Sequence, residues 1–337
     1  MTAAIRTRRL TLRVPVADDA ARIADLANDP DVVRLLTTVP HPYTAADAAE
    51  FVAKVADSGA ARVIVADEII GMVGLDSMLG YWLGKAHWGR GYAVEAARAT
   101  VAWHFAQGGG DLRSGYLDDN RASRNVLIRC GFVADGDTRV ETVRGTHHDL
   151  HLMRLTRARY EAIRDYRIET ARLVLSPLTE DDVPALAVLA GPHEVSRMLA
   201  SIPHPFTEDD AFEWMQRRIY CGRPGFMLGI RREGALVGCV GMGGTPVSVM
   251  YWLGMDHWGQ GLATEAMRGF LGDIFDRFAL DAVEAGCFLD NPSSARVLEK
   301  LGFAKTGESV QRSRARVEPA PHFDYRLDRA AFEAGKP

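Results

Sequence analysis

Cysteine is scarce in this sequence, and none of it is arranged for cross-linking. Four cysteines occur among 337 residues, at positions 130, 221, 239 and 287, and no two of them form a CxxC pair or recur at matched places in the two halves. This pattern favours reduced thiols over a disulfide framework or a zinc site. We therefore expect a cytoplasmic protein without a metal centre.

Long apolar runs and a strong net charge are also missing. No segment approaches the roughly 20 apolar residues that span a bilayer, and the arginine-rich start lacks the apolar stretch of a signal peptide. Forty Lys and Arg stand against forty-four Asp and Glu, a net charge of -4. Without a broad basic surface, we expect neither nucleic acid nor a membrane as a partner.

What the chain does contain is a long internal repeat. YWLGKAHWGRGYAVEA at 81–96 and YWLGMDHWGQGLATEA at 251–266 agree at eleven of sixteen positions, 170 residues apart. Three further pairs of segments echo each other in the same order: 7–20 with 170–183, 39–52 with 202–215, and 120–132 with 291–303. A chain of 337 residues exceeds one ordinary core of about 250 to 300 residues, so the repeat predicts two homologous domains, 1–160 and 161–337. The charged segment 160–169 would be a short helix or linker at the seam.

Hydrophobic periodicity gives each copy the same order of elements. In the first copy we expect strands at 9–14, 62–67, 69–76, 79–83, 112–117 and 150–155, the last paired with a strand from residue 133. Helices are expected at 17–27, 45–56, 93–107 and 123–129, and the prolines around His41 predict a loop. The fold class is therefore α/β (mixed α+β), with a mixed, mostly antiparallel sheet and helices on both faces.

The repeated turn, WGRGYA at 88–93 and WGQGLA at 258–263, links a strand to the start of a helix. Glycines allow an anion to approach the backbone, and the first N–H groups and dipole of a helix favour negative charge. A cradle for phosphate or pyrophosphate is one interpretation, and a tight turn that merely needs glycine is the other. The turn is not a Walker A loop, because GxxxxGK[ST] is absent and neither Lys nor Ser/Thr follows the glycines. It is not a GxGxxG fingerprint either, because the third glycine is missing and Glu95 and Glu265 follow.

With this context, the sequence resembles the GNAT acetyltransferase superfamily, in particular the branch of ribosomal-protein N-terminal acetyltransferases. The pyrophosphate loop of that family reads [QR]xxGx[GA], and here Trp88 and Trp258 replace its first residue. The segments NRASRNVLIRCGF at 120–132 and NPSSARVLEKLGF at 291–303 fit the same pattern. The resemblance spans nearly all of each copy and implies a tandem of two GNAT domains that use acetyl-CoA.

The resemblance also implies which residues hold acetyl-CoA. The loops would bind its pyrophosphate, strand ends would flank its pantetheine arm, and one asparagine in each copy would contact that arm or cap the following helix. The expected cofactor-binding residues are Trp82, Leu83, Trp88, Gly89, Arg90, Gly91, Tyr92, Ala93, Val94 and Asn120 in the first copy, and Trp252, Leu253, Trp258, Gly259, Gln260, Gly261, Leu262, Ala263, Thr264 and Asn291 in the second.

Catalytic residues are harder to assign. Many family members carry a tyrosine seven residues after the asparagine as the acid for the leaving thiolate, but here Leu127 and Leu298 stand there. Ser123 and Ser294, three residues after each asparagine, are the catalytic candidates, because they are the best remaining hydroxyls for bonding the sulfur. Each is equally suited to capping the first turn of a helix.

Other repeated or clustered residues have two interpretations each. Glu95 and Glu265 would serve as bases or complement a helix dipole. His41 and His204 would relay a proton or shape the acceptor site, and His87 and His257 would orient the loop. The HHDLH cluster at 147–151 has no counterpart in the second copy and is a weak metal motif.

Two hypotheses follow. The first is an N-acetyltransferase that moves an acetyl group from acetyl-CoA to a primary amine, a protein N-terminus or a small molecule, by direct attack in a ternary complex. The second is a non-catalytic acyl-CoA sensor, or a scaffold with one degenerate half. The sequence leaves open the acceptor, the working half, and whether the chain is a monomeric pseudo-dimer or a homo-oligomer.

Overall fold

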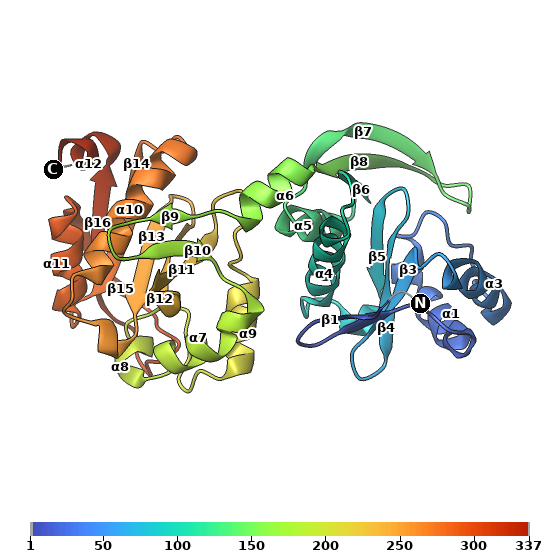
Figure 1. Cartoon of the computed structure of the whole chain (residues 1–337), viewed down its shortest axis with the longest axis horizontal. Helices are drawn as coiled ribbons and strands as arrows, with labels where there is room; N and C mark the ends of the chain where they lie inside the picture. The colour runs from blue at the N-terminus through green and yellow to red at the C-terminus, as the bar shows by residue number, and fades with distance from the viewer. Residues whose placement is uncertain (1–2, 336–337) are drawn as a thin grey trace. The chain divides into compact units, whose positions relative to one another are not determined.

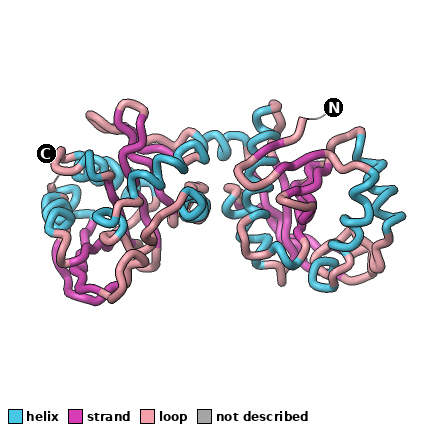
Figure 2. Tube along the Cα trace, turned by 90° about the horizontal axis from the view of Figure 1, so that it is seen from below, coloured by secondary structure: helices cyan, strands magenta, loops and turns pink. Residues whose placement is uncertain are grey.

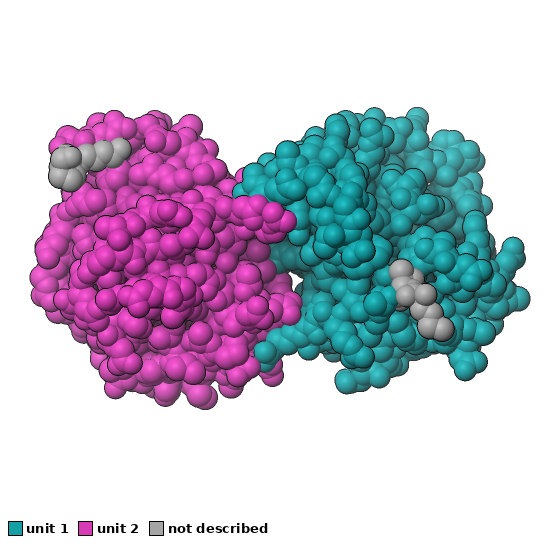
Figure 3. Space-filling model, viewed as in Figure 1, with its two compact units in different colours: residues 1–162 teal, residues 163–337 magenta. Residues whose placement is uncertain are grey.

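The computed structural model describes residues 3–335 and divides the chain into two compact units, 1–162 and 163–337 (Figures 1 and 3). Helix α6 (Arg157–Arg164) contains the boundary between them. In each unit, helices pack against both faces of the strands (Figure 2). The expected fold class, mixed α/β with a mostly antiparallel sheet and helices on both faces, is confirmed.

Unit 1 contains two sheets, one of five strands in the order β1-β2-β3-β4-β5 and one of three in the order β6-β8-β7. Its strands are β1 (Ile5–Arg6), β2 (Thr11–Arg13), β3 (Ala61–Val65), β4 (Ile69–Leu75), β5 (Leu79–Leu83), β6 (Leu112–Leu117), β7 (Val133–Glu141) and β8 (His147–Leu155). Its helices are α1 (Ala20–Ala27), α2 (Pro30–Val33), α3 (Ala45–Ala56), α4 (Tyr92–Ala106) and α5 (Arg121–Arg129), with single 3₁₀ turns at Ala17–Asp19 and Lys85–His87.

Unit 2 repeats this order in one sheet of eight strands, β15-β16-β14-β13-β12-β11-β10-β9. The strands are β9 (Ile168–Glu169), β10 (Val174–Pro177), β11 (Phe226–Arg232), β12 (Ala235–Gly243), β13 (Ser248–Leu253), β14 (Ala282–Phe288), β15 (Ala304–Gln311) and β16 (Ala320–Asp328). The helices are α7 (Val183–Ala190), α8 (His193–Ser196), α9 (Glu208–Gln216), α10 (Leu262–Arg277), α11 (Pro292–Lys300) and α12 (Arg329–Ala334), with 3₁₀ turns at Glu180–Asp182 and Met255–His257.

The central strands of unit 2 separate almost as soon as they meet. β13 and β14 are parallel and register at a single pair, Ser248 with Glu284, whereas every other neighbouring pair in this sheet is antiparallel. In unit 1 the matching strands β5 and β6 belong to different sheets, and the hydroxyl of Ser114 donates to the carbonyl of Leu79 at 2.7 Å across the gap. Each unit therefore has a split in the middle of its strands, which leaves strand backbone groups open to another partner.

Two apolar layers in unit 2 fix which side chains face each side of that split. α10 buries a stripe that includes Leu262, Phe270 and Ile274, and this stripe packs with Cys287 and Tyr325 on one face of the sheet. Trp214 of α9 and Trp252 of β13 belong to a separate cluster on the opposite face. Because side chains alternate along a strand, Tyr251 and Trp252 point to opposite faces.

The sequence predicted most of these elements but missed several short ones. The helix expected at 45–56 has those bounds, and that expected at 93–107 is α4 at 92–106. Strands β1 and β9, of two residues each, and helices α2 and α8, of four, are too short to produce a periodic signal. At the seam, the segment 160–169 that was expected as a short helix or linker contains the end of helix α6 and, after it, strand β9.

The loops around His41 and His204 are irregular, as their prolines predicted, and each contains a cis His–Pro peptide bond. Over residues 3–335, none of the helices is both long enough and apolar enough to cross a membrane.

Candidate active site

The repeated glycine turn forms the start of a long helix in both units. Gly261 has φ +75°, a left-handed conformation that favours glycine, and it precedes α10 without any side-chain cap. The first intrahelical bond runs from the N–H of Glu265 to the carbonyl of Gly261. The N–H groups of residues 262–264 therefore lie ahead of the helical ladder, where an anion can bind them.

Unit 1 has the same geometry. Gly91 has φ +79°, α4 begins without a side-chain cap, and the N–H of Glu95 donates to the carbonyl of Gly91. A Cβ added at Gly89 or Gly259 would meet no atom within 4 Å, so the outer side of each turn is open.

The tryptophan that begins each turn fixes the turn to the preceding strand. The indole N–H of Trp258 donates to the carbonyl of Leu253 at 2.8 Å, and Trp88 makes the same bond to Leu83 at 2.8 Å. Both rings are otherwise largely exposed. This contact explains why a tryptophan replaces the Gln or Arg of the family loop, because the indole closes the loop onto the end of the strand.

The repeated glutamates anchor the helix that starts at the turn. Glu265 accepts hydrogen bonds from the hydroxyl of Thr170 at 2.7 Å, from the N–H of Arg172 at 2.7 Å and from the Arg172 guanidinium at 2.6 Å. Burial alone would raise the pKa of Glu265, but these hydrogen bonds outweigh it and lower the pKa below 4.5. A second Arg172 nitrogen donates to the carbonyl of Gln260 at 3.0 Å, so the network extends into the turn.

Glu95 makes the same three bonds in unit 1, from Thr7 at 2.6 Å and from Arg9 at 3.0 and 2.7 Å, and its side chain is 1% exposed. The glutamates therefore connect the helix to the loop that joins the first two strands of each unit. The sequence offered two roles for these glutamates, a general base or a negative charge near the positive end of the helix dipole. The hydrogen bonds give them a structural role that explains both glutamates without a role as general base.

Positive charge surrounds the two turns in different ways. Unit 1 carries Arg90 within the turn itself, where the side chain is exposed. Unit 2 has Gln260 there, and Gln260 accepts a bond from Arg232 at 2.8 Å, while Arg172 lies behind the turn. In both units a guanidinium therefore lies within or beside the glycine turn.

Asparagine, serine and tyrosine meet beside the split in unit 2. Asn291 caps α11 by accepting the N–H of Ser294 at 3.2 Å, and the hydroxyl of Ser294 lies 2.8 Å from the hydroxyl of Tyr251 on β13. Burial raises the pKa of Tyr251, so the phenol keeps its proton, and burial raises the pKa of the neighbouring Cys287 thiol to about 11. The capping role of the asparagine is thus present, and the serine has a buried phenol as its partner.

The same three residues meet in unit 1. Asn120 accepts the N–H of Ser123 at 3.0 Å, and the Ser123 hydroxyl lies 3.0 Å from that of Tyr81, whose pKa burial also raises. Tyr81 and Tyr251 were not among the site residues expected from the sequence. The available signal was that both open the repeated YWLG segment, but only the fold shows that they reach the serines.

A cavity of about 1040 Å³ in unit 2 joins these features. It is lined by the turn (Trp258, Gly259, Gly261), by Tyr251 and Trp252 of β13, by Gly286 of β14, and by Asn291 and Ser294. The buried indole N–H of Trp252 has no hydrogen-bond partner among the described residues. This is an orphan donor in the wall of a cavity, and such a donor favours a bound group with a carbonyl or hydroxyl oxygen.

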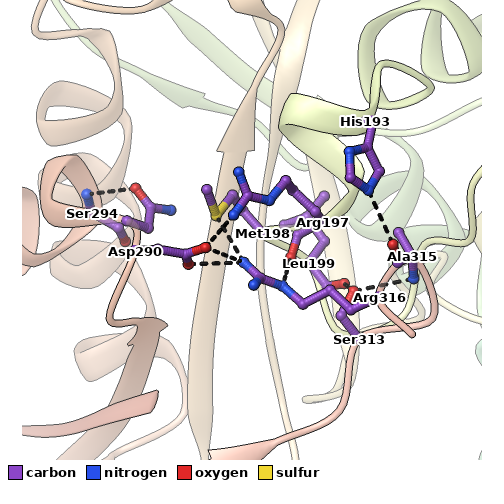
Figure 4. Close-up of polar contacts among 10 residues, drawn as sticks. His193, Arg197, Met198, Leu199, Asp290, Ser294, Ser313, Ala315 and Arg316 are labelled. Atoms are coloured by element: carbon purple, nitrogen blue, oxygen red, sulfur yellow. Dashed lines mark hydrogen bonds and ion pairs between the residues drawn. The ribbon is translucent and has the colours of Figure 1, made fainter. Parts of the chain in front are cut away.

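An ionic cluster is centred on Asp290, which lines the cavity (Figure 4). Asp290 pairs with Arg197 and with Arg316, which approaches it at 2.8 Å. The same Arg316 donates to the carbonyl of Arg197 at 2.8 Å, and the hydroxyl of Ser313 donates to the carbonyl of Leu199 at 2.7 Å. The hairpin between β15 and β16 is thereby fixed to the loop after α8.

Unit 1 has a smaller ionic cluster at the matching place. Arg34 pairs with Asp119 at 2.8 Å, but Arg144 donates to the carbonyls of Leu36 and Val39 at 2.7 and 2.5 Å. The two units therefore share the cradle and differ at the opposite end of the split.

The remaining sequence candidates lie away from this centre or at its edge. Nδ1 of His204 donates to the carbonyl of Gly191, and this exposed histidine does not line the cavity. His41 is exposed in its loop. His257 lines the cavity beside the turn. In the HHDLH segment, His151 pairs with Asp137 at 2.7 Å, and no group of three or more potential metal ligands occurs within residues 3–335.

Comparisons with known proteins match both halves of the chain. A family model described as "Acetyltransferase (GNAT) domain" matches residues 9–133 and residues 172–304. YoaA, an uncharacterized N-acetyltransferase of Bacillus subtilis (strain 168), is 28% identical over 149 residues, which cover 42% of this chain and 84% of that protein. The ribosomal-protein-serine acetyltransferase of Escherichia coli (strain K12) is 33% identical over 81 residues, covering 21% of this chain and 44% of that protein.

Among solved structures, the chain is similar to an acetyltransferase at low identity. The microcin C7 self immunity acetyltransferase MccE, solved in complex with acetyl-CoA and AMP, is 20% identical and covers 44% of this chain and 93% of its own, with a TM-score of 0.40.

The three hydrogen bonds that Glu265 accepts lead to a prediction about stability. Glu265→Gln removes a charged acceptor of three hydrogen bonds, so we expect the free energy of unfolding to fall by about 2 kcal/mol at neutral pH. The pKa of Glu265 is lowered in the folded protein, so its contribution is present above pH 4.5 and is lost as the pH falls through the lowered pKa. Urea unfolding of both proteins across this pH range measures it.

The matched control is Glu308→Gln, which removes an exposed carboxylate paired with Lys305 and should change stability by less than about 0.5 kcal/mol. A difference between wild type and Glu265→Gln that stays constant down to acid pH would contradict the role assigned to the carboxylate.

Proposed function

The chain belongs to the GNAT acetyltransferase family, and from this premise we propose that unit 2 transfers the acetyl group of acetyl-CoA to a primary amine by direct attack in a ternary complex. The observation that carries the proposal is the cavity of unit 2, which runs from an uncapped helix start, past a split between strands, to a separate wall of ionic groups. A cofactor and a second substrate both fit such an arrangement.

The residues of unit 2 fit acetyl-CoA part by part. Backbone N–H groups of 259–264 would hold the pyrophosphate, with Arg172 and Arg232 beside them. The open edge of β13 would pair with the amide groups of pantetheine beyond Ser248, and the orphan indole N–H of Trp252 is a further donor there. When bound, acetyl-CoA supplies the electrophilic thioester carbonyl. Gly89 to Val94 and Asn120 would hold a second molecule in unit 1 by the same contacts.

The pair of Ser294 and Tyr251 is the proposed proton donor for the leaving thiolate. The phenol is buried and its pKa is raised, so it is neutral at physiological pH and can donate through the serine hydroxyl or directly. Many relatives have a tyrosine as this acid at the position where Leu298 stands. The Ser294 and Tyr251 pair would take its place. Ser123 and Tyr81 have the same geometry in unit 1.

The first test asks whether the protein turns over and whether the cradle of unit 2 is used. We expect release of free thiol from acetyl-CoA with at least one amine in a panel of spermidine, kanamycin, glycine, and peptides that begin with serine or alanine. Gly261→Trp should abolish this release, because the indole would fill the left-handed turn and block the N–H groups.

Gly91→Trp reports the matching site in unit 1, and calorimetry with acetyl-CoA shows which affinity each variant loses. Gly272→Ala is the control on the same helix, since a Cβ there meets no atom within 4 Å. Binding of acetyl-CoA without thiol release for any amine would favour the sensor over the enzyme.

The second test concerns the acid. Tyr251→Phe keeps the ring and removes the hydroxyl, so kcat should fall by roughly 10²-fold or more while the affinity for acetyl-CoA is retained. Rates are measured by thiol release, and Tyr81→Phe is the matched variant in unit 1. Wild-type kcat in Tyr251→Phe would remove the Ser294 and Tyr251 pair from the mechanism.

A further inference from the structure

Two side chains on β16 form a pair that the mechanism above does not use. Nδ1 of His322 lies 3.0 Å from Oδ1 of Asp324, and Asp324 also accepts a bond from the hydroxyl of Ser309 at 3.1 Å. The His322 side chain is 17% exposed, and both residues line the cavity of unit 2. An imidazole held at Nδ1 by a carboxylate has its tautomer fixed, which leaves Nε2 as the nitrogen that accepts a proton.

The position of the ring is specified by its neighbours. His322 pairs across the sheet with Phe288, whose ring packs edge-on against the imidazole at 5.4 Å. The imidazole lies across Gly286, where an added Cβ would be 2.0 Å from Cε1 and 2.8 Å from Nε2. Gly286 lies on β14 just past the pair Ser248 and Glu284, where the split opens. Only a glycine at 286 allows the ring to lie beside the split.

The dyad and the proposed acid lie on opposite faces of the sheet. Tyr325 and Cys287 face α10 and α11, on the same side as Tyr251. Side chains alternate along β16, so His322 and Asp324 face the other side, where Trp252 lies. Acetyl transfer needs a base for the attacking ammonium and an acid for the leaving thiolate, and groups on opposite faces of the split can act on one carbonyl without neutralising each other.

Unit 1 lacks this pair at the matching places. β6 and β8 register Leu117 with Leu150 and Gly115 with Leu152, as β14 and β16 register Phe288 with His322 and Gly286 with Asp324. Leucines 150 and 152 therefore replace the histidine and the aspartate. The two units keep the same cradle and the same serine and tyrosine, but a titratable pair beside the split occurs in unit 2 and not at these positions of unit 1.

We propose that His322, oriented by Asp324, is the group that accepts the proton of the acceptor ammonium in unit 2, and that unit 1 lacks this base. This inference rests on the proposed acetyl transfer. The ammonium gives one proton to Nε2 of His322, directly or through one water, and the neutral amine forms the new C–N bond. The C–S bond then breaks, and the thiolate gains a proton from the Ser294 and Tyr251 pair. The nitrogen of the new amide loses its extra proton, which restores the proton of that pair through water, and the imidazolium releases its proton to solvent.

The charged groups around His322 affect how kcat depends on pH. Asp324 is on its own strand, and β15 presents the uncharged Ser309 and Gly307 opposite the pair. From β14 the neighbours are Phe288 and Gly286, and the guanidinium of Arg316 lies over the Phe288 ring, 4.5 Å from its centroid. Arg316 is in turn paired with Asp290. Asp324 is thus the carboxylate in direct contact with the imidazole.

The test uses the full-length protein, acetyl-CoA and whichever amine of the panel above gives the fastest wild-type release of thiol. H322N keeps a nitrogen donor for Asp324 and removes Nε2, so we expect kcat to fall by about 10²- to 10⁴-fold with acetyl-CoA affinity by calorimetry retained. Wild-type kcat should decline toward acid pH as the imidazole takes up a proton, and H322N should lose this decline. D324N removes the carboxylate that fixes the tautomer of His322, and it should lower kcat less than H322N does.

L150N is the matched control in unit 1 and should leave kcat at the wild-type value. H322N that keeps wild-type kcat and its decline at acid pH would overturn the assignment, as would a loss of kcat accompanied by an equal loss of acetyl-CoA affinity, since both indicate a structural role. Wild-type protein that releases no thiol with any amine of the panel would instead overturn the proposed function, and His322 as its base with it.

Discussion

The geometry of the candidate site depends on two parallel strands that meet at one residue pair and then separate. β13 and β14 register only at Ser248 and Glu284, and backbone groups beyond that pair have no neighbouring strand to bond. The separation opens a space that reaches both faces of the sheet, so residues on either face can contact one bound group. The cradle at the start of α10, the Ser294 and Tyr251 pair, and the His322 and Asp324 pair all border this space.

The cradle itself combines two physical requirements in one short segment. A left-handed glycine turns the chain sharply from the strand into the helix, and the uncapped helix start presents N–H groups and a positive dipole to the solvent. The indole of Trp258 and the carboxylate of Glu265 hold the turn from two sides, one to the preceding strand and one to the loop that begins the unit. Both units keep the left-handed glycine, the tryptophan and the glutamate, because the geometry of the turn depends on all three.

The sequence predicted the family, the order of elements and the glycine turn before the long helix, because these depend on local patterns that occur twice. The glycine turn, the asparagine caps and the apolar stripes of α4 and α10 are all visible as spacing in the chain. The cofactor contacts named from the sequence remain proposals, but the structure brings Trp252, Gly259, Gly261, Asn291 and Ser294 around one cavity.

The candidate acid and base were out of reach from the sequence, since both depend on pairing between distant strands. Tyr251 reaches Ser294 across 43 residues, and His322 lies beside Gly286 only because β16 pairs with β14 in one register. A shift of a single residue would turn His322 to the other face. The difference between the units was hidden for the same reason, because β8 and β16 do not resemble each other in sequence.

A crystal structure of the full chain with acetyl-CoA would show whether the split between β13 and β14 holds the cofactor. We expect density for the pyrophosphate against the N–H groups of residues 259–264, and for the pantetheine arm between β13 and β14 with the acetyl group between Tyr251 and His322. Density for acetyl-CoA elsewhere on unit 2, with the split between β13 and β14 empty, would contradict it.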